Sequence, residues 1–313
     1  MNIVILDAMT LGGSSLEEIK KLGKLTIYDT TNKKEVVKRA KDADVILTNK
    51  VVLDSVILKQ LPNLKLICVT ATGMNNIDLE SAKALKIDVK NVADYSTNAV
   101  AQHTFMFALN LLGQLKHYDK FVKKGKWAKN EIFCHINKSN EIYELDNKTW
   151  GIIGLGNIGA KVGNIAKSFG ANVIYYSTSG KNNSKEFKQE KNLENLIKDS
   201  DIISIHAPLN AQTKNLITKK ELNLLKTNAI LLNMGRGGIV NESDLYKCIK
   251  KKDFYFACDV LEVEPMTENH PFLDKKIQHK LLLTPHIAWA YKESRARLLE
   301  GVEKNIKDFI SKK

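Results

Sequence analysis

Short apolar runs alternate with amphipathic stretches over the first part of the chain. The apolar runs fall at residues 3–6, 25–28, 45–47 and 66–69, and the amphipathic stretches fall at 16–22, 34–41 and 54–60. Apolar runs of this length are typical of buried strands, whereas apolar residues at i, i+3 and i+4 are typical of helices. Strand and helix in alternation predict a parallel sheet covered by helices on both faces. A further helix is predicted at 78–85, where Asp78 can act as the N-cap.

A second series of the same kind begins at residue 149. Its strands are predicted at 149–154, 172–176, 201–206, 229–233, 254–260 and 281–284, with helices between them. Six such strands match the sheet of a dinucleotide-binding domain. The tail at 292–309 is amphipathic and predicts a final helix.

Two segments between these series depart from the alternating pattern. Residues 99–112 are apolar nearly all round, which predicts a helix buried on most faces, as between two domains or two subunits. Residues 125–148 show little periodicity. A long irregular stretch in a compact protein is often functional or part of an interface.

Length and composition fit an ordinary globular protein. The 313 residues suit two domains or one large α/β unit, and 43% hydrophobic with 27% charged residues is a usual balance. The N-terminus reads as a first strand rather than a signal, and no apolar window approaches the roughly 18 residues of a membrane span. The four cysteines, at 68, 134, 248 and 258, lack C-x-x-C spacing. We therefore expect a reduced, cytoplasmic chain with neither a metal site nor disulfides.

The formal net charge of +13 raises nucleic-acid binding as an alternative. The lysines, however, are scattered singly and in pairs, and no arginine-rich stripe or aromatic-interleaved basic patch is present. We therefore expect neither nucleic acid nor membrane as a partner. The positive charge can still steer an anionic substrate or cofactor.

A glycine loop follows the first strand of the second series. Gly154-Leu155-Gly156-Asn157-Ile158-Gly159 fits G-x-G-x-x-G between an apolar run and a predicted helix at 160–169. In such a loop the first glycine permits the tight turn, the second lets the backbone approach a pyrophosphate, and the third allows close helix–strand packing. The motif alone is weak, but between a strand and a helix it is strong. It predicts a dinucleotide site.

One expected element of an NAD site is missing. An acidic residue usually ends the second strand and binds the ribose hydroxyls. Here the strand at 172–176 runs into Ser177-Thr178-Ser179-Gly180-Lys181. Hydroxyls and Lys181 would tolerate a 2′-phosphate, so NADP stands beside NAD, bound through Ser177 or water, as an equal alternative.

Three short segments near the C-terminus carry an arginine, a glutamate and a histidine in unusual settings. Arg236 lies in the loop 233–238, Glu264 follows the strand at 254–260, and His286 follows the strand at 281–284. A guanidinium can clamp a carboxylate through two parallel hydrogen bonds. An imidazole exchanges a proton near neutral pH, and a neighbouring carboxylate holds it in one tautomer and favours its protonated form.

Each of these residues also has a structural interpretation. A lone arginine in a glycine loop can satisfy carbonyls, and a lone histidine after a strand is more often structural than catalytic. Position favours chemistry, because Arg236, Asp259 and His286 are all predicted at or just past the C-terminal end of a strand. Ligands of open α/β sheets bind at that edge.

These segments resemble the D-isomer-specific 2-hydroxyacid dehydrogenase family, and the similarity extends over essentially the whole chain. Other matching segments are residues 75–78 and 206–209, with Thr213. Within the family the sequence is most similar to the glycerate dehydrogenase (hydroxypyruvate reductase) group, through residues 71–76, 95–97, 100–103 and 286–290.

The resemblance implies roles at the matching positions. Arg236 would bind the carboxylate and carbonyl of the substrate, and His286, paired with Glu264, would be the acid/base. The backbone of Thr72 and Gly73 would receive the substrate carboxylate. Asp259 would contact the nicotinamide ribose or carboxamide. The full set of expected cofactor contacts is Thr97, Gly154, Gly156, Asn157, Ile158, Gly159, Ser177, His206, Pro208, Thr213 and Asp259.

The resemblance also implies the architecture, which is α/β with two doubly wound parallel-sheet domains. A Rossmann-type cofactor domain at 99–290 would be inserted into a flavodoxin-like substrate domain at 1–98 plus 291–313. Family members are usually homodimers, formed mainly through the cofactor domain. That assembly suits the apolar helix at 99–112 and the irregular stretch at 125–148.

Motifs and resemblance together predict an oxidoreductase that transfers a hydride between NAD, or NADP, and a small D-2-hydroxy acid or 2-keto acid. The favoured pair is D-glycerate and hydroxypyruvate, with glyoxylate as a further substrate. A D-lactate dehydrogenase or a broad 2-ketoacid reductase would use the same residues, because specificity lies in a few pocket side chains such as Met74 and Trp289. A non-enzymatic NAD-sensing scaffold is the rival from another class, and retention of Arg236, Glu264 and His286 argues against it.

Overall fold

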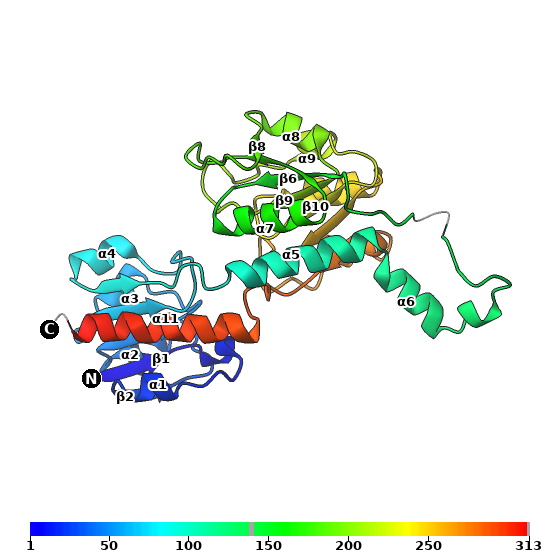
Figure 1. Cartoon of the computed structure of the whole chain (residues 1–313). Coiled ribbons are helices and arrows are strands. Elements are labelled where there is room, and N and C mark those ends of the chain that lie inside the picture. Colours follow the sequence, from blue (N-terminus) through cyan, green and yellow to red (C-terminus); the bar gives the residue numbers. More distant parts are fainter. Residues whose placement is uncertain (138–140, 312–313) are drawn as a thin grey trace. The chain divides into compact units, whose positions relative to one another are not determined.

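The structure is a computed structural model that describes residues 1–137 and 141–311 (Figure 1). It divides into two compact units. Unit 1 contains Met1–Ser96 and Trp289–Lys313, and unit 2 contains Thr97–Ala288. Unit 1 is thus built from both ends of the chain, and unit 2 from its middle.

Unit 1 is a five-stranded parallel sheet in the order β2-β1-β3-β4-β5, which is the flavodoxin order. Its strands are β1 (Asn2–Ile5), β2 (Lys24–Ile27), β3 (Val45–Thr48), β4 (Leu66–Val69) and β5 (Asp88–Lys90). Its helices are α1 (Glu17–Lys20), α2 (Val36–Ala40), α3 (Ser55–Leu58), α4 (Leu79–Ala84) and α11 (Lys292–Ile310), with a 3₁₀ turn at Ala8–Leu11.

Alternate residues of the central strands β1, β3 and β4 enter two separate cores. Val4 and Ile46 pack in the core that includes residues of α2, α3 and α4, whereas Ile3 and Leu47 pack in the core that includes residues of α1 and α11. Because successive side chains of a strand point to opposite faces, helices cover both faces of the sheet. The doubly wound prediction is confirmed for this unit.

Unit 2 is a seven-stranded parallel sheet in the order β12-β11-β10-β9-β6-β7-β8. Its first six strands in the chain follow the Rossmann order, with β12 added beyond β11. The strands are β6 (Thr149–Ile153), β7 (Asn172–Tyr176), β8 (Lys188–Gln189), β9 (Ile202–Ile205), β10 (Ile230–Asn233), β11 (Tyr255–Cys258) and β12 (Leu281–Leu283). The helices are α5 (Thr97–Leu112), α6 (Leu115–Lys123), α7 (Asn157–Ser168), α8 (Leu193–Asp199), α9 (Lys219–Leu222) and α10 (Glu242–Ile249), and 3₁₀ turns lie at Trp127–Lys129, Pro271–Leu273 and Gln278–Lys280.

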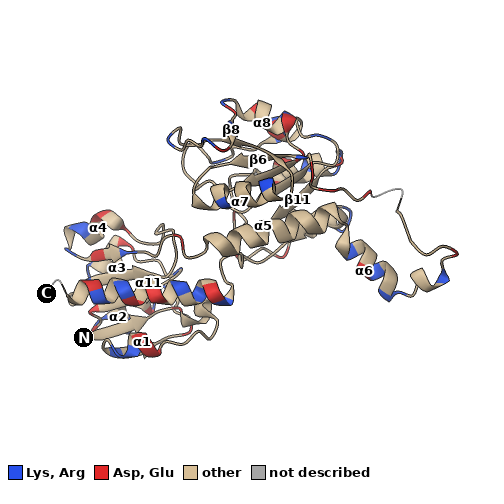
Figure 2. Cartoon of the chain, in the orientation of Figure 1, with Lys and Arg blue, Asp and Glu red and all other residues tan. Residues whose placement is uncertain are grey.

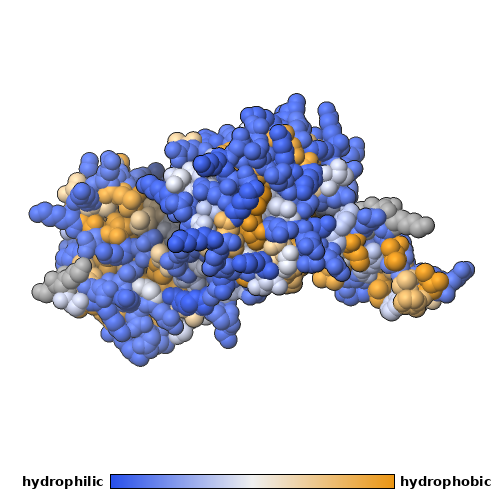
Figure 3. All heavy atoms as spheres, turned by 45° about the horizontal axis from the view of Figure 1, so that its top comes forward, coloured by the Kyte–Doolittle hydropathy of each residue, from blue (hydrophilic) through white to orange (hydrophobic). Residues whose placement is uncertain are grey.

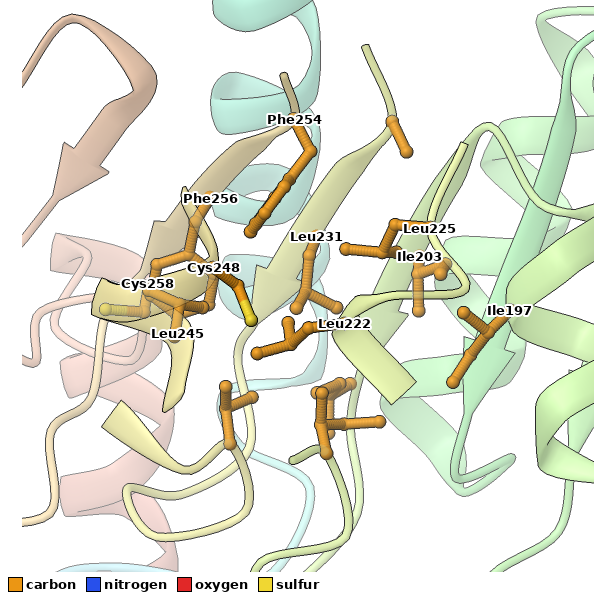
Figure 4. Packing of buried hydrophobic residues seen from close by; sticks show 14 of the residues in the cluster. Ile197, Ile203, Leu222, Leu225, Leu231, Leu245, Cys248, Phe254, Phe256 and Cys258 are labelled. Atoms are coloured by element: carbon orange, nitrogen blue, oxygen red, sulfur yellow. The ribbon is translucent and has the colours of Figure 1, made fainter. Parts of the chain in front are cut away.

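Two apolar cores cover the two faces of this sheet as well. One joins β9, β10 and β11 to α8, α9 and α10, and Figure 4 shows Leu231, Leu245 and Phe256 converging in it. The other joins α5 and α7 to the opposite face, where Phe105 stacks on Trp150. The central strands are therefore rigidly held, and the loops at their carboxyl ends start from fixed positions.

The structure differs from the predicted elements in several places. The strands β5 and β8 were not predicted, because both are short edge strands rich in polar residues. The helix α6 was also missed, and the described residues of this stretch, 125–137 and 141–148, are irregular apart from the 3₁₀ turn at Trp127–Lys129. The apolar helix α5 is buried on most faces, but Met106 and Leu109 are exposed on its remaining face.

No helix in the described ranges is both long enough and apolar enough to cross a membrane. Acidic and basic residues are interspersed along helices such as α11, as the ribbon colours of Figure 2 show. The expectation that nucleic acid is not a partner stays a prediction.

Candidate active site

The glycine loop forms the turn between β6 and α7, as the motif predicted. Gly154 has a φ of +93°, and a Cβ at this position would lie 2.8 Å from the backbone nitrogen of Ala207. Only glycine accommodates both the backbone conformation and the close approach. Gly156 is the N-cap of α7 and nothing lies within 4 Å of a Cβ built there. Asn157, Ile158 and Gly159 form the first turn of α7, whose amide groups favour an anion.

Two buried polar side chains at the same edge of the sheet have no hydrogen-bond partner within the described residues. They are Ser177, directly after β7, and His206, directly after β9. Burial lowers the pKa of His206 to about 3, so its ring is neutral at physiological pH. Buried polar groups are almost always paired in folded proteins. Unpaired groups beside the β6 turn therefore fit a site that receives a polar cofactor.

The loop after His206 is closed by Thr213. The Thr213 hydroxyl donates to the carbonyl of Pro208 at 2.6 Å and accepts the Asn210 N–H at 2.8 Å. Thr213 is fully buried, whereas Pro208 is exposed. The hydroxyl thus shapes the loop, and the predicted cofactor contacts of Pro208 and Thr213 stay predictions.

The catalytic candidates follow three adjacent strands of unit 2. Arg236 lies in the loop after β10, Glu264 in the loop after β11, and His286 in the loop after β12. The first two loops pack directly together, because a Cβ at Gly237 would lie 1.8 Å from the carbonyl oxygen of Leu261. Glycine at 237 is therefore required for this close approach.

The Arg236 side chain is exposed at this edge. Its Nη1 donates to the carbonyl of Gly235 at 2.8 Å, and its own carbonyl accepts from the Asn233 side chain at 2.9 Å. One backbone bond uses one of the five N–H donors of a guanidinium. The remaining donors are enough for a bidentate contact with a carboxylate.

His286 and Glu264 form a close pair. Nδ1 of His286 lies 2.6 Å from Oε2 of Glu264, and their side chains are 23% and 32% exposed. Oε1 of Glu264 accepts the N–H of Leu261 at 2.9 Å, which fixes the carboxylate within its own loop. With Nδ1 directed to the carboxylate, Nε2 is the ring atom that can exchange a proton with a substrate.

Asp259 holds the segment that contains His286. Its Oδ1 accepts the N–H of Ile287 and its Oδ2 the N–H of Ala288, both at 2.8 Å, while Oδ1 also accepts the hydroxyl of Thr284 at 2.6 Å. The sequence analysis assigned Asp259 to the nicotinamide, and that contact stays a prediction. Its role in holding the backbone around His286 was not predicted from the sequence.

The remaining predicted residues lie near the ends of other elements. Thr97 is the first residue of α5 in unit 2. Thr72 and Gly73 follow β4 in unit 1, where the Thr72 carbonyl accepts from the Asn91 side chain at 2.6 Å. Met74 and Trp289 are partly buried against the two cores of unit 1. The roles predicted for these residues stay predictions.

A further support of the Glu264 loop could not be predicted from the sequence. Oε1 of Glu242, in the first turn of α10, accepts the N–H of Glu262 at 2.7 Å. The other oxygen, Oε2, lies 3.0 Å from Nε2 of the buried His270. Nδ1 of His270 accepts the Phe272 N–H, so Nε2 carries the ring proton and donates a hydrogen bond to Oε2 of Glu242.

The sequence of this chain matches one family model and the sequences of several known enzymes. A family model described as D-isomer specific 2-hydroxyacid dehydrogenase, NAD binding domain, matches residues 105–288. A hydroxypyruvate reductase from Blautia hydrogenotrophica is 34% identical over 99% of this chain and 97% of its own length. A glyoxylate reductase from Aeropyrum pernix is 37% identical over 89% of this chain and 83% of its own length.

Solved structures agree with this assignment. A D-lactate dehydrogenase from Aquifex aeolicus, complexed with NAD and lactic acid, superposes with a TM-score of 0.85 at 27% identity, covering 99% of this chain and 96% of that one. An acyclic imino acid reductase (Bsp5) in complex with NADPH and D-Arg gives a TM-score of 0.86 at 28% identity, covering 100% and 98%.

The chain belongs to the D-isomer-specific 2-hydroxyacid dehydrogenase family. It is an oxidoreductase that uses NAD or NADP to interconvert D-2-hydroxy acids and 2-keto acids. The predictions of fold class, family, reaction type and cofactor class are confirmed.

Proposed function

We propose that this enzyme reduces hydroxypyruvate to D-glycerate, and glyoxylate as a smaller substrate of the same kind. The observation that carries the proposal is the His286–Glu264 pair beside the Arg236 loop at one sheet edge. The names of the relatives, which include hydroxypyruvate reductase, glycerate dehydrogenase and glyoxylate reductase, support the choice of substrate.

Arg236 binds the substrate carboxylate and polarises the carbonyl. NAD(P)H, when bound, supplies the hydride that reduces the carbonyl carbon. His286 donates its Nε2 proton to the carbonyl oxygen, so hydride and proton together convert the carbonyl group to an alcohol. Glu264 keeps Nδ1 protonated and balances the charge of the imidazolium. Arg236 stabilises the negative charge that develops on the oxygen, which is usually the largest single contribution to such catalysis.

The cofactor is held by the glycine turn and by the groups at the ends of β7 and β9. The amides at the start of α7 bind the pyrophosphate. Ser177 contacts the adenosine ribose, where a hydroxyl in place of a carboxylate admits either a free 2′-hydroxyl or a 2′-phosphate. Exposed Lys181, four residues further on, is the nearest cation along the chain for the latter. The proposed site therefore admits either NAD or NADP.

A D-lactate dehydrogenase or a broad 2-ketoacid reductase is the second candidate. One observation favours it, which is the fold similarity to a D-lactate dehydrogenase over 99% of this chain. Rates with NADH and with NADPH against hydroxypyruvate, glyoxylate, pyruvate and phosphohydroxypyruvate separate the two. The proposal predicts the highest kcat/KM for hydroxypyruvate, and a preference for pyruvate contradicts it. A chain that binds nucleotide but reduces none of the four is a sensing scaffold.

We further propose a homodimer formed through α5, α6 and the described residues 124–137 and 141–142 of unit 2. Figure 3 shows apolar side chains gathered over this segment. Phe133 is 89% exposed and Ile136 is 73% exposed, and the other exposed apolar residues of the segment are Met106, Leu109, Leu115, Val122, Trp127, Ile132 and Ile142. Exposed apolar surface of this extent commonly marks a protein interface.

Light scattering coupled to size exclusion tests the assembly. The wild type should elute with twice the mass of one chain, and Phe133→Asp should shift it toward one. Ile310→Asp, at an exposed apolar residue of α11 in unit 1, is the control and should leave the mass unchanged. A wild type with the mass of one chain contradicts the dimer.

A cytoplasmic location is proposed on the four free cysteines, three of them buried.

A further inference from the structure

One buried histidine of unit 2 has no part in the chemistry described so far. His103 lies on α5, is 1% exposed, and meets the edge of Phe107 at a centroid distance of 4.8 Å. Its Nε2 lies 3.0 Å from Oγ1 of Thr284, two residues before His286. A helix on one face of the sheet is thereby connected to the loop after β12.

The direction of this hydrogen bond follows from its neighbours. Oγ1 of Thr284 has a single proton, and at 2.6 Å that proton is donated to Oδ1 of Asp259, because an ionised carboxylate only accepts. The hydroxyl therefore accepts from His103, and Nε2 of His103 carries a proton. Burial lowers the pKa of His103, while the nearby Asp259 charge acts to raise it. The donors run in one direction, from His103 to Thr284 to Asp259.

Asp259 also binds the backbone that follows His286 in the chain. Its two oxygens accept the N–H groups of Ile287 and Ala288 at 2.8 Å. His286 itself has a φ of +55°, in the left-handed region that residues with a side chain seldom adopt. The Asp259 carboxylate is thus bonded to residues before and after a strained position, and it is oriented by Thr284 and His103.

We propose that His103 is a positioning residue for the reaction, which acts through Thr284 and Asp259 to hold the turn that presents His286. The proposal rests on the proposed function of His286. Without the Nε2 donor, the Thr284 hydroxyl keeps only its bond to Asp259, and the carboxylate is held less firmly on that side. The imidazole of His286 then samples positions away from the substrate carbonyl. Small displacements of a catalytic group lower the rate strongly, while binding of substrate and cofactor changes little.

Four variants test the proposal. His103→Phe keeps the ring and its contact with Phe107 but removes the donor, and His103→Gln restores an N–H donor. Thr284→Val removes the hydroxyl. Thr104→Val is the matched control, because Thr104 is equally buried on α5 and its hydroxyl donates at 2.7 Å to the carbonyl of Val100 within the helix.

Steady-state kinetics should give a fall in kcat of roughly 10- to 100-fold for His103→Phe and for Thr284→Val, with KM within about threefold of wild type. His103→Gln should recover most of the loss, and Thr104→Val should match wild type. The double variant His103→Phe, Thr284→Val should be no slower than the worse single variant, because both remove the same chain of donors. Additive losses, or equal losses in Thr104→Val, overturn the proposal.

Hydrogen–deuterium exchange supplies a readout that does not depend on turnover. The amides of Ile287 and Ala288 should exchange faster in His103→Phe and Thr284→Val than in wild type or Thr104→Val. Unchanged exchange in both variants overturns the proposal whatever the kinetics. A wild type that is inert with every keto acid would refute the proposed function instead, and the exchange comparison would still decide whether His103 holds the turn.

Discussion

Glu264 connects His286 to the loop after β11. Its Oε2 lies 2.6 Å from Nδ1 of His286, while its Oε1 accepts the N–H of Leu261 at 2.9 Å. Both oxygens of one carboxylate are therefore fixed. A carboxylate restrained in this way determines which ring nitrogen of the histidine faces the substrate.

Replacing this carboxylate should impair the chemical step. In Glu264→Gln the amide can no longer balance the charge of the imidazolium. Its NH₂ group can also donate to Nδ1, which favours the tautomer in which Nδ1 is unprotonated. We expect kcat to fall by at least about 100-fold with cofactor affinity unchanged. Steady-state rates and a fluorescence titration with NADH measure the two effects. Glu262→Gln, at an exposed glutamate of the same loop, is the control, and an equal loss there would contradict the assignment.

Arg236 should report on substrate binding. A lysine keeps the charge at this position but cannot form two parallel hydrogen bonds to a carboxylate. Arg236→Lys should raise KM for the keto acid by about 10-fold or more and also lower kcat, because the same guanidinium stabilises the developing charge. The measurement is a rate curve over substrate concentration at saturating cofactor. Unchanged KM would mean that the guanidinium, bonded to Gly235, serves its own loop only.

Asp7 should be important for the stability of unit 1. Its buried carboxylate accepts the N–H groups of Asn49, Lys50 and Val51 and the hydroxyl of Thr48, just past β1 and β3. In Asp7→Asn an NH₂ group replaces one carboxylate oxygen and faces the backbone N–H donors. This mismatch should lower the free energy of unfolding by about 1–3 kcal/mol. The midpoint of urea unfolding should fall relative to wild type and to the exposed control Asp42→Asn. Equal midpoints in the two variants would refute this role.

The cysteines should differ sharply in reactivity. Burial raises the pKa of Cys68 to about 12, and burial also raises the pKa of Cys248 and of Cys258. The thiolate is the reactive form, and a raised pKa lowers its fraction at every pH below that value. Native protein at pH 8 should therefore label at partly exposed Cys134 first, as peptide mapping after a short pulse of iodoacetamide would show. Early labelling of Cys258 would contradict the buried β11.

Local patterns in the sequence predicted the alternation of strands and helices and the glycine turn, whereas the division into two domains and the roles of most site residues came from the resemblance to the family. The apolar runs matched the central strands because residues buried on both faces must be continuously apolar. The turn at Gly154 was predictable because the first glycine of the motif marks a position where the tight turn needs a positive φ. Edge strands such as β8 lack an apolar signal and were missed.

Contacts between distant segments could not be predicted in the same way. The clamp of Asp259 on Ile287 and Ala288 depends on the pairing of β11 with β12, which brings residues far apart in the chain together. The bond from His103 to Thr284 spans 181 positions of sequence. Both residues were visible in the sequence, one in an apolar helix and the other before Pro285, but neither setting indicates a role in positioning His286.

The most direct test of the account is the turnover of His286→Ala with hydroxypyruvate, measured together with its affinity for the cofactor. Without an imidazole no group at this position donates the proton, so kcat should fall by roughly 1,000-fold or more, while the dissociation constant for NADH or NADPH stays within about twofold of wild type. His279→Ala, at an exposed histidine before β12, should leave both quantities unchanged. Full turnover in His286→Ala would contradict the account.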